Sequence, residues 1–338
     1  MENANYYKKR NDNKVQCQLC HHSCLITNNQ TGICNARKNL GGILYSLNYG
    51  YPITQNIDPI EKKPLFHFLP GTETYSIGTL GCNFKCANCQ NWTISQAKNI
   101  EKNISTITYV KPEAIVKSAI ENDCQSIAYT YNEPTVFTEY ALEVMKIAHA
   151  NGIKNIWVSN GYMSKTCLND ITPYLDAINI DLKSIDANFY KNNCSARIEP
   201  VLENLKNIKK SPVHLEITTL IIPNLSSEPS MLQRLAEFIA NELGTDIPWH
   251  IARFSPESSW KLKALPPTLS DIIITTHEIG KDAGLKYVYV GNLPGDQREN
   301  TFCSQCNKLV IQRFGYDIER YDKNGRCPKC DTSLDLIL

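Results

Sequence analysis

Short β-branched segments alternate with longer amphipathic segments through the middle of the chain. Residues 135–150 predict a helix, because Val136, Tyr140 and Val144 recur close to one helical face. Residues 230–242 and 270–283 have a similar pattern. The apolar segments between these helices predict strands at residues 74–80, 126–131, 154–159, 177–182, 213–222, 249–254 and 286–290.

Repeated strand–helix–strand order predicts an α/β protein with right-handed crossovers and a parallel sheet. Six or seven such units fit a full or partial (β/α) barrel, and a doubly wound open sheet is the alternative. In both architectures, side chains that carry chemistry collect at the carboxyl ends of the strands.

Fourteen cysteines are the most informative part of the composition. Eleven fall into three sets, which favours metal binding in a reducing compartment over disulfides. The sets divide the chain into an N-terminal segment (1–60), a barrel (72–292) and a C-terminal module (296–338). Cys124, Cys167 and Cys194 lie outside the sets and are interpreted as small buried apolar residues.

The remaining composition excludes several classes of protein. A formal net charge of +1 gives no general reason to expect nucleic acid or an anionic membrane as partner. The polar start at Met1 lacks the apolar core of a secretory signal. The apolar runs are too short to span a bilayer. We therefore expect a cytoplasmic protein.

The central cysteine set, Cys82-x3-Cys86-x2-Cys89, directly follows the first predicted barrel strand. A [4Fe–4S] cluster normally takes four thiolates, so three would leave one iron open to a substrate or cofactor. Part of a zinc site is the alternative. It is disfavoured because structural zinc normally requires four protein ligands and no fourth cysteine is near in sequence.

The segment around these cysteines resembles the cluster loop of radical S-adenosylmethionine (SAM) enzymes related to pyruvate formate-lyase activating enzyme. Tyr131-Asn-Glu133-Pro134 is similar to a Gly-Gly-Glu-Pro-like motif of that family, which implies that Glu133 binds the SAM amino group. The resemblance also implies that Asp181 and Lys183 contact the SAM ribose or carboxylate. For Asn160 two interpretations stay open: its side chain contacts a ligand, or the residue simply forms a turn.

Across nearly its whole length the chain resembles the radical SAM enzymes of the AmmeMemoRadiSam system. The resemblance rests on both terminal cysteine sets and on segments 129–134, 216–223 and 287–292. Glu216 and residues 249–256 depart from pyruvate formate-lyase activating enzyme, which argues against its glycyl-radical substrate here.

The terminal cysteine sets predict two further metal sites. Cys303-x2-Cys306 and Cys327-x2-Cys330 can supply four thiolates to zinc or to a single iron, as in a zinc ribbon or a rubredoxin-like module. The N-terminal set is less regular and could hold zinc, which we favour slightly, or an auxiliary [4Fe–4S] cluster. It consists of Cys17, Cys20, Cys24 and Cys34.

Histidines have smaller expected roles. His21 and His22 could replace one N-terminal thiolate, although an exposed, solvated pair is favoured. His67, His214 and His250 are interpreted as packing or rim residues rather than catalytic ones.

These features lead to one main functional hypothesis and two alternatives. In the main hypothesis, the reduced cluster cleaves SAM to a 5′-deoxyadenosyl radical, which takes hydrogen from an unidentified substrate. The alternatives are an activating enzyme that installs a glycyl radical on a partner protein, and a non-catalytic zinc-stabilised binding protein. The resemblance implies an electron donor such as flavodoxin or ferredoxin and raises Memo-type or AMMECR-type proteins as partners.

Overall fold

A computed structural model describes all residues, 1–338, and its centre is an eight-stranded sheet. The strand order is β14-β13-β12-β11-β10-β9-β8-β7. Strands β8 to β14 pair in parallel, and β7 pairs antiparallel with β8. The strands are β7 (Thr54–Pro59), β8 (Glu73–Gly78), β9 (Ser126–Tyr129), β10 (Lys154–Ser159), β11 (Ala177–Asp181), β12 (His214–Ile221), β13 (Trp249–Arg253) and β14 (Val288–Gly291).

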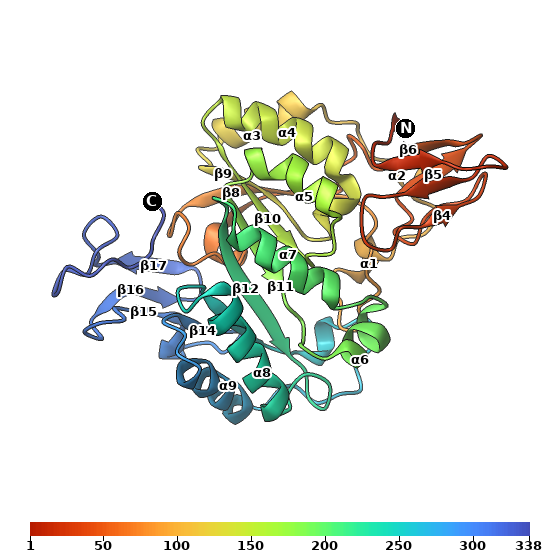
Figure 1. Ribbon diagram of the computed structural model, residues 1–338. Coiled ribbons are helices and arrows are strands. Elements are labelled where there is room, and N and C mark those ends of the chain that lie inside the picture. Colours follow the sequence, from red (N-terminus) through yellow and green to blue (C-terminus); the bar gives the residue numbers. More distant parts are fainter.

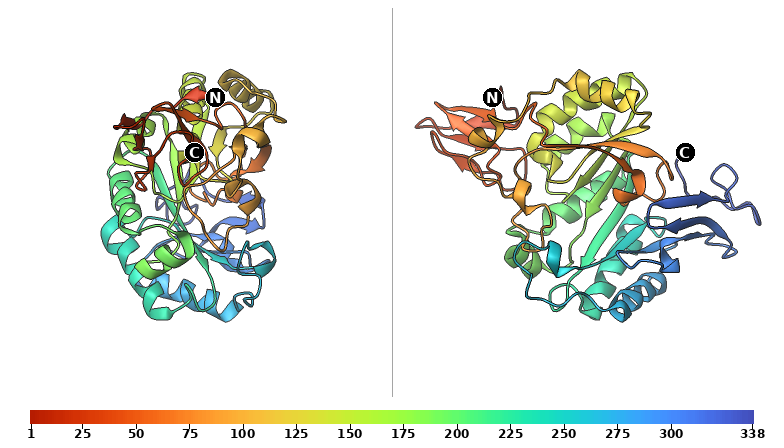
Figure 2. Two further views of the ribbon diagram at one scale, coloured as in Figure 1. Left: turned by 90° about the vertical axis from the view of Figure 1, so that its right-hand side faces the viewer. Right: turned by 180° about the vertical axis from the view of Figure 1, so that it is seen from behind.

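Helices wrap around the outer face of this sheet, which stays open between β7 and β14 (Figures 1 and 2). The fold is therefore the partial barrel that the sequence predicts. The helices are α1 (Trp92–Ser95), α2 (Ile100–Ile104), α3 (Pro112–Glu121), α4 (Thr138–Ala150), α5 (Lys165–Ile171), α6 (Ala187–Phe189), α7 (Glu199–Lys209), α8 (Pro229–Phe238) and α9 (Ser270–Asp282). None of them is both long and apolar enough to cross a membrane.

Two small antiparallel modules lie at opposite ends of the barrel strands (Figures 1 and 2). In the N-terminal one, Cys20 forms a β-bridge with Met163, just beyond the carboxyl end of β10. In the C-terminal one, Ile337 pairs with Phe68 at the other end. Their strands are β1 (Glu2–Asn3), β2 (Tyr7–Lys9), β3 (Val15–Cys17), β4 (Leu25–Ile26), β5 (Arg37–Leu40), β6 (Ile43–Ser46), β15 (Thr301–Phe302), β16 (Leu309–Phe314) and β17 (Asp317–Arg320).

All seven predicted strands are present, each within two residues of its expected limits. The helix expected from residue 135 begins at Thr138, because Pro134 starts a short 3₁₀ turn that ends at Phe137. The helix expected over 230–242 ends at Phe238 and continues as a π turn, Ile239–Leu243. Strand β7 was not predicted, since its sequence is mostly polar and exposed.

A buried carboxylate organises the amino-terminal end of the barrel. Glu216 of β12 is fully buried and accepts hydrogen bonds from the backbone N–H groups of Phe66 and His67, at 3.0 and 2.7 Å. His214 and His250 lie 2.9 and 2.6 Å away through their Nε2 atoms. Glu216 therefore fixes the loop before β8 inside the barrel, at the end opposite the cysteine loop.

The C-terminal module is attached to the same loop. Arg313 of β16 donates to the carbonyl of Phe66 at 3.1 Å and to Thr301 Oγ1 at 2.7 Å. Its guanidinium carbon lies 4.1 Å from the centre of the Phe66 ring. Tyr289 of β14 completes the contact, because its hydroxyl is 2.9 Å from Thr301 and 2.6 Å from Nε2 of His67.

Because His67 is buried, we expect the stability of the protein to depend on pH. Burial lowers its pKa to about 4, whereas an unfolded histidine titrates near 6.5. The unfolded chain therefore binds the extra proton first, and stability falls as the pH drops through this window. We expect the free energy of unfolding to lose about 2 kcal/mol between pH 7.5 and 5, at about 1.4 kcal/mol per pKa unit. Urea unfolding at the two pH values measures the free energy of unfolding. If the His67→Gln variant lost as much stability between pH 7.5 and 5, the assignment of this loss to His67 would be contradicted.

Candidate metal and cofactor site

The loop that leaves β8 carries the three central cysteines at the carboxyl edge of the sheet. Cys86 is buried, and Cys82 and Cys89 are partly exposed as residues. Cys89 donates its backbone N–H to the carbonyl of Cys86 at 3.1 Å, which closes the loop on itself. Gly81 enters the loop with φ +99°, and a Cβ there would lie 2.6 Å from the carbonyl oxygen of Cys34. Only glycine fits this close approach.

The three thiols interact with one another, which suits a shared metal group. Burial raises the pKa of Cys82, and the charges of Glu133, Cys86 and Cys89 raise it further. Burial also raises the pKa of Cys89. A raised pKa means that ionising these thiols is costly. Metal binding compensates for that cost, because a metal ligates the thiolate and displaces its proton. Three thiols in one buried loop therefore fit an iron–sulfur cluster with one iron left open.

Glu133 lies next to this loop with its carboxylate almost fully hydrogen-bonded. It is 2% exposed. Oε1 accepts from the N–H and hydroxyl of Thr135, at 3.1 and 2.6 Å, and from the hydroxyl of Ser159 at 2.8 Å. Oε2 accepts only from the N–H of Asn160, at 2.8 Å. Oε2 therefore keeps capacity for one more donor.

Asn160 connects Glu133 to the cysteine loop. Its Nδ2 donates to Oδ1 of Asn83 at 2.7 Å, and its own Oδ1 accepts from the N–H of Tyr162 at 3.0 Å. Asn83 directly follows Cys82, so these bonds set the position of the cluster loop relative to the end of β10. The geometry gives Asn160 a structural role here, one of its two predicted interpretations.

Asp181 is the last residue of β11 and forms an ion pair of 3.0 Å with Lys183, which follows the strand. The Lys183 side chain is 15% exposed. Although burial opposes its charge, the charges of Asp181, Cys86 and Cys194 raise the pKa of Lys183. The structure thus brings Glu133, Asn160, Lys183 and the three cysteines into one region.

Sequence reasoning missed Cys194. The structure places its thiol within hydrogen-bonding reach of Cys86. Backbone bonds hold it there, because the N–H of Lys85 donates to the carbonyl of Cys194 and that of Ala87 to the carbonyl of Asn193, both at 2.9 Å. Cys194 is buried in the core, as predicted, and is also a fourth thiol beside the central loop. Cys194 lies far along the chain from Cys86, so no cysteine spacing in the sequence indicated this contact.

The C-terminal cysteines form a compact group. Their four sulfur atoms all lie within 4.8 Å of one another. The Cys303–Cys330 and Cys306–Cys327 sulfur pairs are 3.5 and 3.6 Å apart. Four thiolates at the usual Zn–S distance of about 2.3 Å would be about 3.8 Å apart in a tetrahedron. The group can therefore bind one metal ion.

Removing this metal group should release the C-terminal module. We expect Cys306→Ser with Cys330→Ser to lose one metal ion per chain and to make residues 296–338 sensitive to proteolysis, since a small module has little core of its own. Metal analysis and limited proteolysis measure both effects. Cys124→Ser, which changes a buried cysteine outside the sets, is the control. Retention of the ion in the double variant would contradict the assignment.

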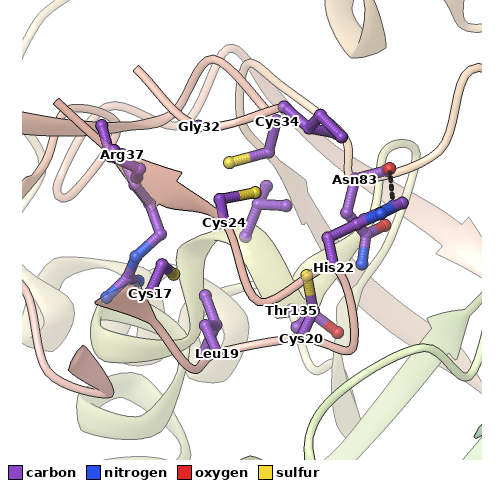
Figure 3. Close-up of a pocket in the computed structure, with 13 residues that line it drawn as sticks. Cys17, Leu19, Cys20, His22, Cys24, Gly32, Cys34, Arg37, Asn83 and Thr135 are labelled. Atoms are coloured by element: carbon purple, nitrogen blue, oxygen red, sulfur yellow. Dashed lines mark hydrogen bonds between the residues drawn. The ribbon is translucent and has the colours of Figure 1, made fainter. Parts of the chain in front are cut away.

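The N-terminal cysteines surround a small cavity (Figure 3). His22 does not point into solvent as expected, because its Nε2 lies 2.8 Å from the carbonyl oxygen of Asn83. His21 and His22 both pack against the ring of Tyr162. The predicted solvated pair is therefore wrong, and the two histidines join the N-terminal module to the barrel.

A partial barrel with three cysteines in a loop at its carboxyl edge has the architecture of an iron–sulfur enzyme. The profile of the radical SAM superfamily matches residues 76–238. An uncharacterized protein of Methanocaldococcus jannaschii is 41% identical over 341 residues, which is 100% of both chains. The chain belongs to the radical SAM superfamily, and membership implies an enzyme with a [4Fe–4S] cluster and SAM.

Two further similarities are more distant. The pyruvate formate-lyase-activating enzyme of Clostridium pasteurianum is 21% identical over 166 residues, which is 48% of this chain and 67% of that protein. The crystal structure of Streptococcus suis SuiB bound to precursor peptide SuiA matches with a TM-score of 0.51 at 12% identity. It covers 70% of this chain and 52% of SuiB, and supports the fold alone.

Proposed function

We propose that Cys82, Cys86 and Cys89 hold a [4Fe–4S] cluster whose open iron binds SAM, and that the resulting radical removes hydrogen from a substrate. Bound there, the cluster supplies one electron that splits SAM into methionine and a 5′-deoxyadenosyl radical. The observation that carries the proposal is the convergence of three interacting thiols with Lys183 and Glu133 at one edge of the sheet.

The surrounding side chains are suited to orient SAM. Oε2 of Glu133 has room for one donor and would accept from the amino group. The ammonium of Lys183 would pair with the carboxylate, while Asp181 would accept from the ribose hydroxyls. Asn160 would act through Glu133 and the cluster loop, as its two hydrogen bonds suggest.

The terminal regions complete the proposed organisation. Segment 1–60 would bind metal through its four cysteines, segment 72–292 would carry the radical chemistry, and segment 296–338 would be a zinc or single-iron module. An electron donor such as flavodoxin or ferredoxin would reduce the central cluster. The resemblance to AmmeMemoRadiSam enzymes supports Memo-type or AMMECR-type proteins as partners.

A protein substrate is the second candidate. Relatives at lower identity are named as activating enzymes, among them one for (2S)-3-sulfopropanediol dehydratase in Klebsiella oxytoca, 24% identical over 131 residues, 39% of this chain and 41% of that protein. A chain that shared this activity would install a glycyl radical on a partner.

The test is SAM cleavage by anaerobically reconstituted protein. With a chemical reductant and SAM, we expect 5′-deoxyadenosine and methionine to form in equal amounts. A glycine-centred radical signal on an added partner would favour the activating-enzyme alternative. A fully loaded cluster that yields no 5′-deoxyadenosine, with or without candidate substrates, would contradict the proposal, and zinc in place of iron would favour a non-catalytic binding protein.

A further inference from the structure

The four N-terminal cysteines line a small, partly open cavity next to the proposed SAM site (Figure 3). The cavity volume is about 20 Å³. One water molecule requires only about 10–15 Å³ on this measure. Four thiolates in contact with a single ion would leave no such space between them. The cavity therefore offers more space than a closed four-thiolate zinc site would leave.

Sulfur spacing leads to the same conclusion. The C-terminal set is the one group in the chain with at least three ligand atoms all within 4.8 Å of one another. The N-terminal set does not meet this limit, and neither does the central set, to which we assign the four-iron cluster. Thiolates on the separate corners of a [4Fe–4S] cube lie farther apart than thiolates on one ion. The N-terminal sulfur atoms are therefore more widely spaced than those of the C-terminal metal group.

Two buried donors at the cavity have no acceptor within the chain. Arg37 is 1% exposed and Asn83 is 1% exposed, and both line the cavity. Nε of Arg37 and Nδ2 of Asn83 lack a hydrogen-bond partner. Buried donors without an acceptor are costly. The sulfur atoms of a cluster would accept from them, as N–H groups do at iron–sulfur sites, where such bonds tune the potential.

The cavity also adjoins the central loop. The carbonyl of Cys34 is in close contact with Gly81, which precedes Cys82. Lys85 lies close enough to both Cys34 and Cys82 to feel their charges. Asn83 belongs to the central loop and to the wall of the N-terminal cavity.

From these observations we infer that Cys17, Cys20, Cys24 and Cys34 bind a second, fully ligated [4Fe–4S] cluster beside the SAM-binding one. Four thiolates would saturate this cluster and leave no open iron for SAM. The inference goes beyond the proposed function, since the N-terminal site does not depend on what the central cluster does.

The test separates the two sites by counting acid-labile sulfide and iron. We expect about eight sulfides per chain after anaerobic reconstitution and about four in a variant with Cys82, Cys86 and Cys89 all changed to Ala, because each cube holds four. The same triple variant should keep a cluster signal in its electron paramagnetic resonance spectrum after reduction. It cannot cleave SAM, so a failure of the proposed function leaves this readout unaffected.

A matched variant guards against misfolding of the triple variant. Cys20→Ser with Cys24→Ser in the otherwise unchanged chain should lower sulfide from about eight to about four, whereas Cys306→Ser with Cys330→Ser should leave it at about eight. Zinc bound in place of sulfide in the triple variant would overturn the inference. So would about four sulfides in the unchanged chain together with none in the triple variant.

Discussion

Replacing Cys82, Cys86 and Cys89 together by Ala is expected to reduce 5′-deoxyadenosine formation to the level of a reaction without protein. The three side chains come from one loop that holds no other cysteine, so no other thiolate of that loop can replace them as ligands. Chromatographic detection of 5′-deoxyadenosine after anaerobic reduction measures the effect.

Cys194→Ala is the informative control for this experiment. Cys194 lies beside Cys86 but outside the loop, and we expect the variant to bind the cluster and retain SAM cleavage. Loss of the central cluster in Cys194→Ala would show that it serves as a fourth ligand. Residual cleavage in the triple variant would contradict the assignment of the ligands.

Replacing Glu216 by Leu is expected to cost about 3–5 kcal/mol of stability, the range found when one partner of a buried charged pair is removed. The substitution would leave the N–H groups of Phe66 and His67 without an acceptor. His214 and His250 would lose the same partner. The midpoint of urea unfolding measures the loss.

Glu101→Gln is the matched surface control. Glu101 pairs with Lys38 at 2.7 Å, but its side chain is 42% exposed. Exposed pairs contribute about 0–1 kcal/mol, so this variant should unfold close to the unchanged chain. Similar midpoints for Glu216→Leu and Glu101→Gln would show that the buried network does not stabilise the barrel.

The sequence predicted the barrel because its strands are apolar on both faces. Strand β9, Ser126–Tyr129, is completely buried, and a short continuous apolar run is typical of a parallel strand. Strand β7 could not be found this way. Its side chains are mostly exposed, and it belongs to the sheet only through backbone pairing with β8.

The site was predictable where its residues are neighbours in sequence. The spacing of Cys82, Cys86 and Cys89 is a local signal. The contact of Cys194 with Cys86 depends instead on how the π-helical turn Tyr190–Cys194 packs against the loop. The Glu216 network was also hidden, because two of its four donors are backbone groups, which no residue type marks.

The close approach of Cys34 to Gly81 has a consequence for how the chain can be divided. The backbone around Cys34 forms part of the wall against which the central loop is folded. A shortened chain that begins after residue 60 would still contain every strand of the barrel except β7. It would expose the loop to water and oxygen on the side that Cys34 covers. We therefore expect the barrel to keep its central loop folded only when it is expressed together with the N-terminal segment.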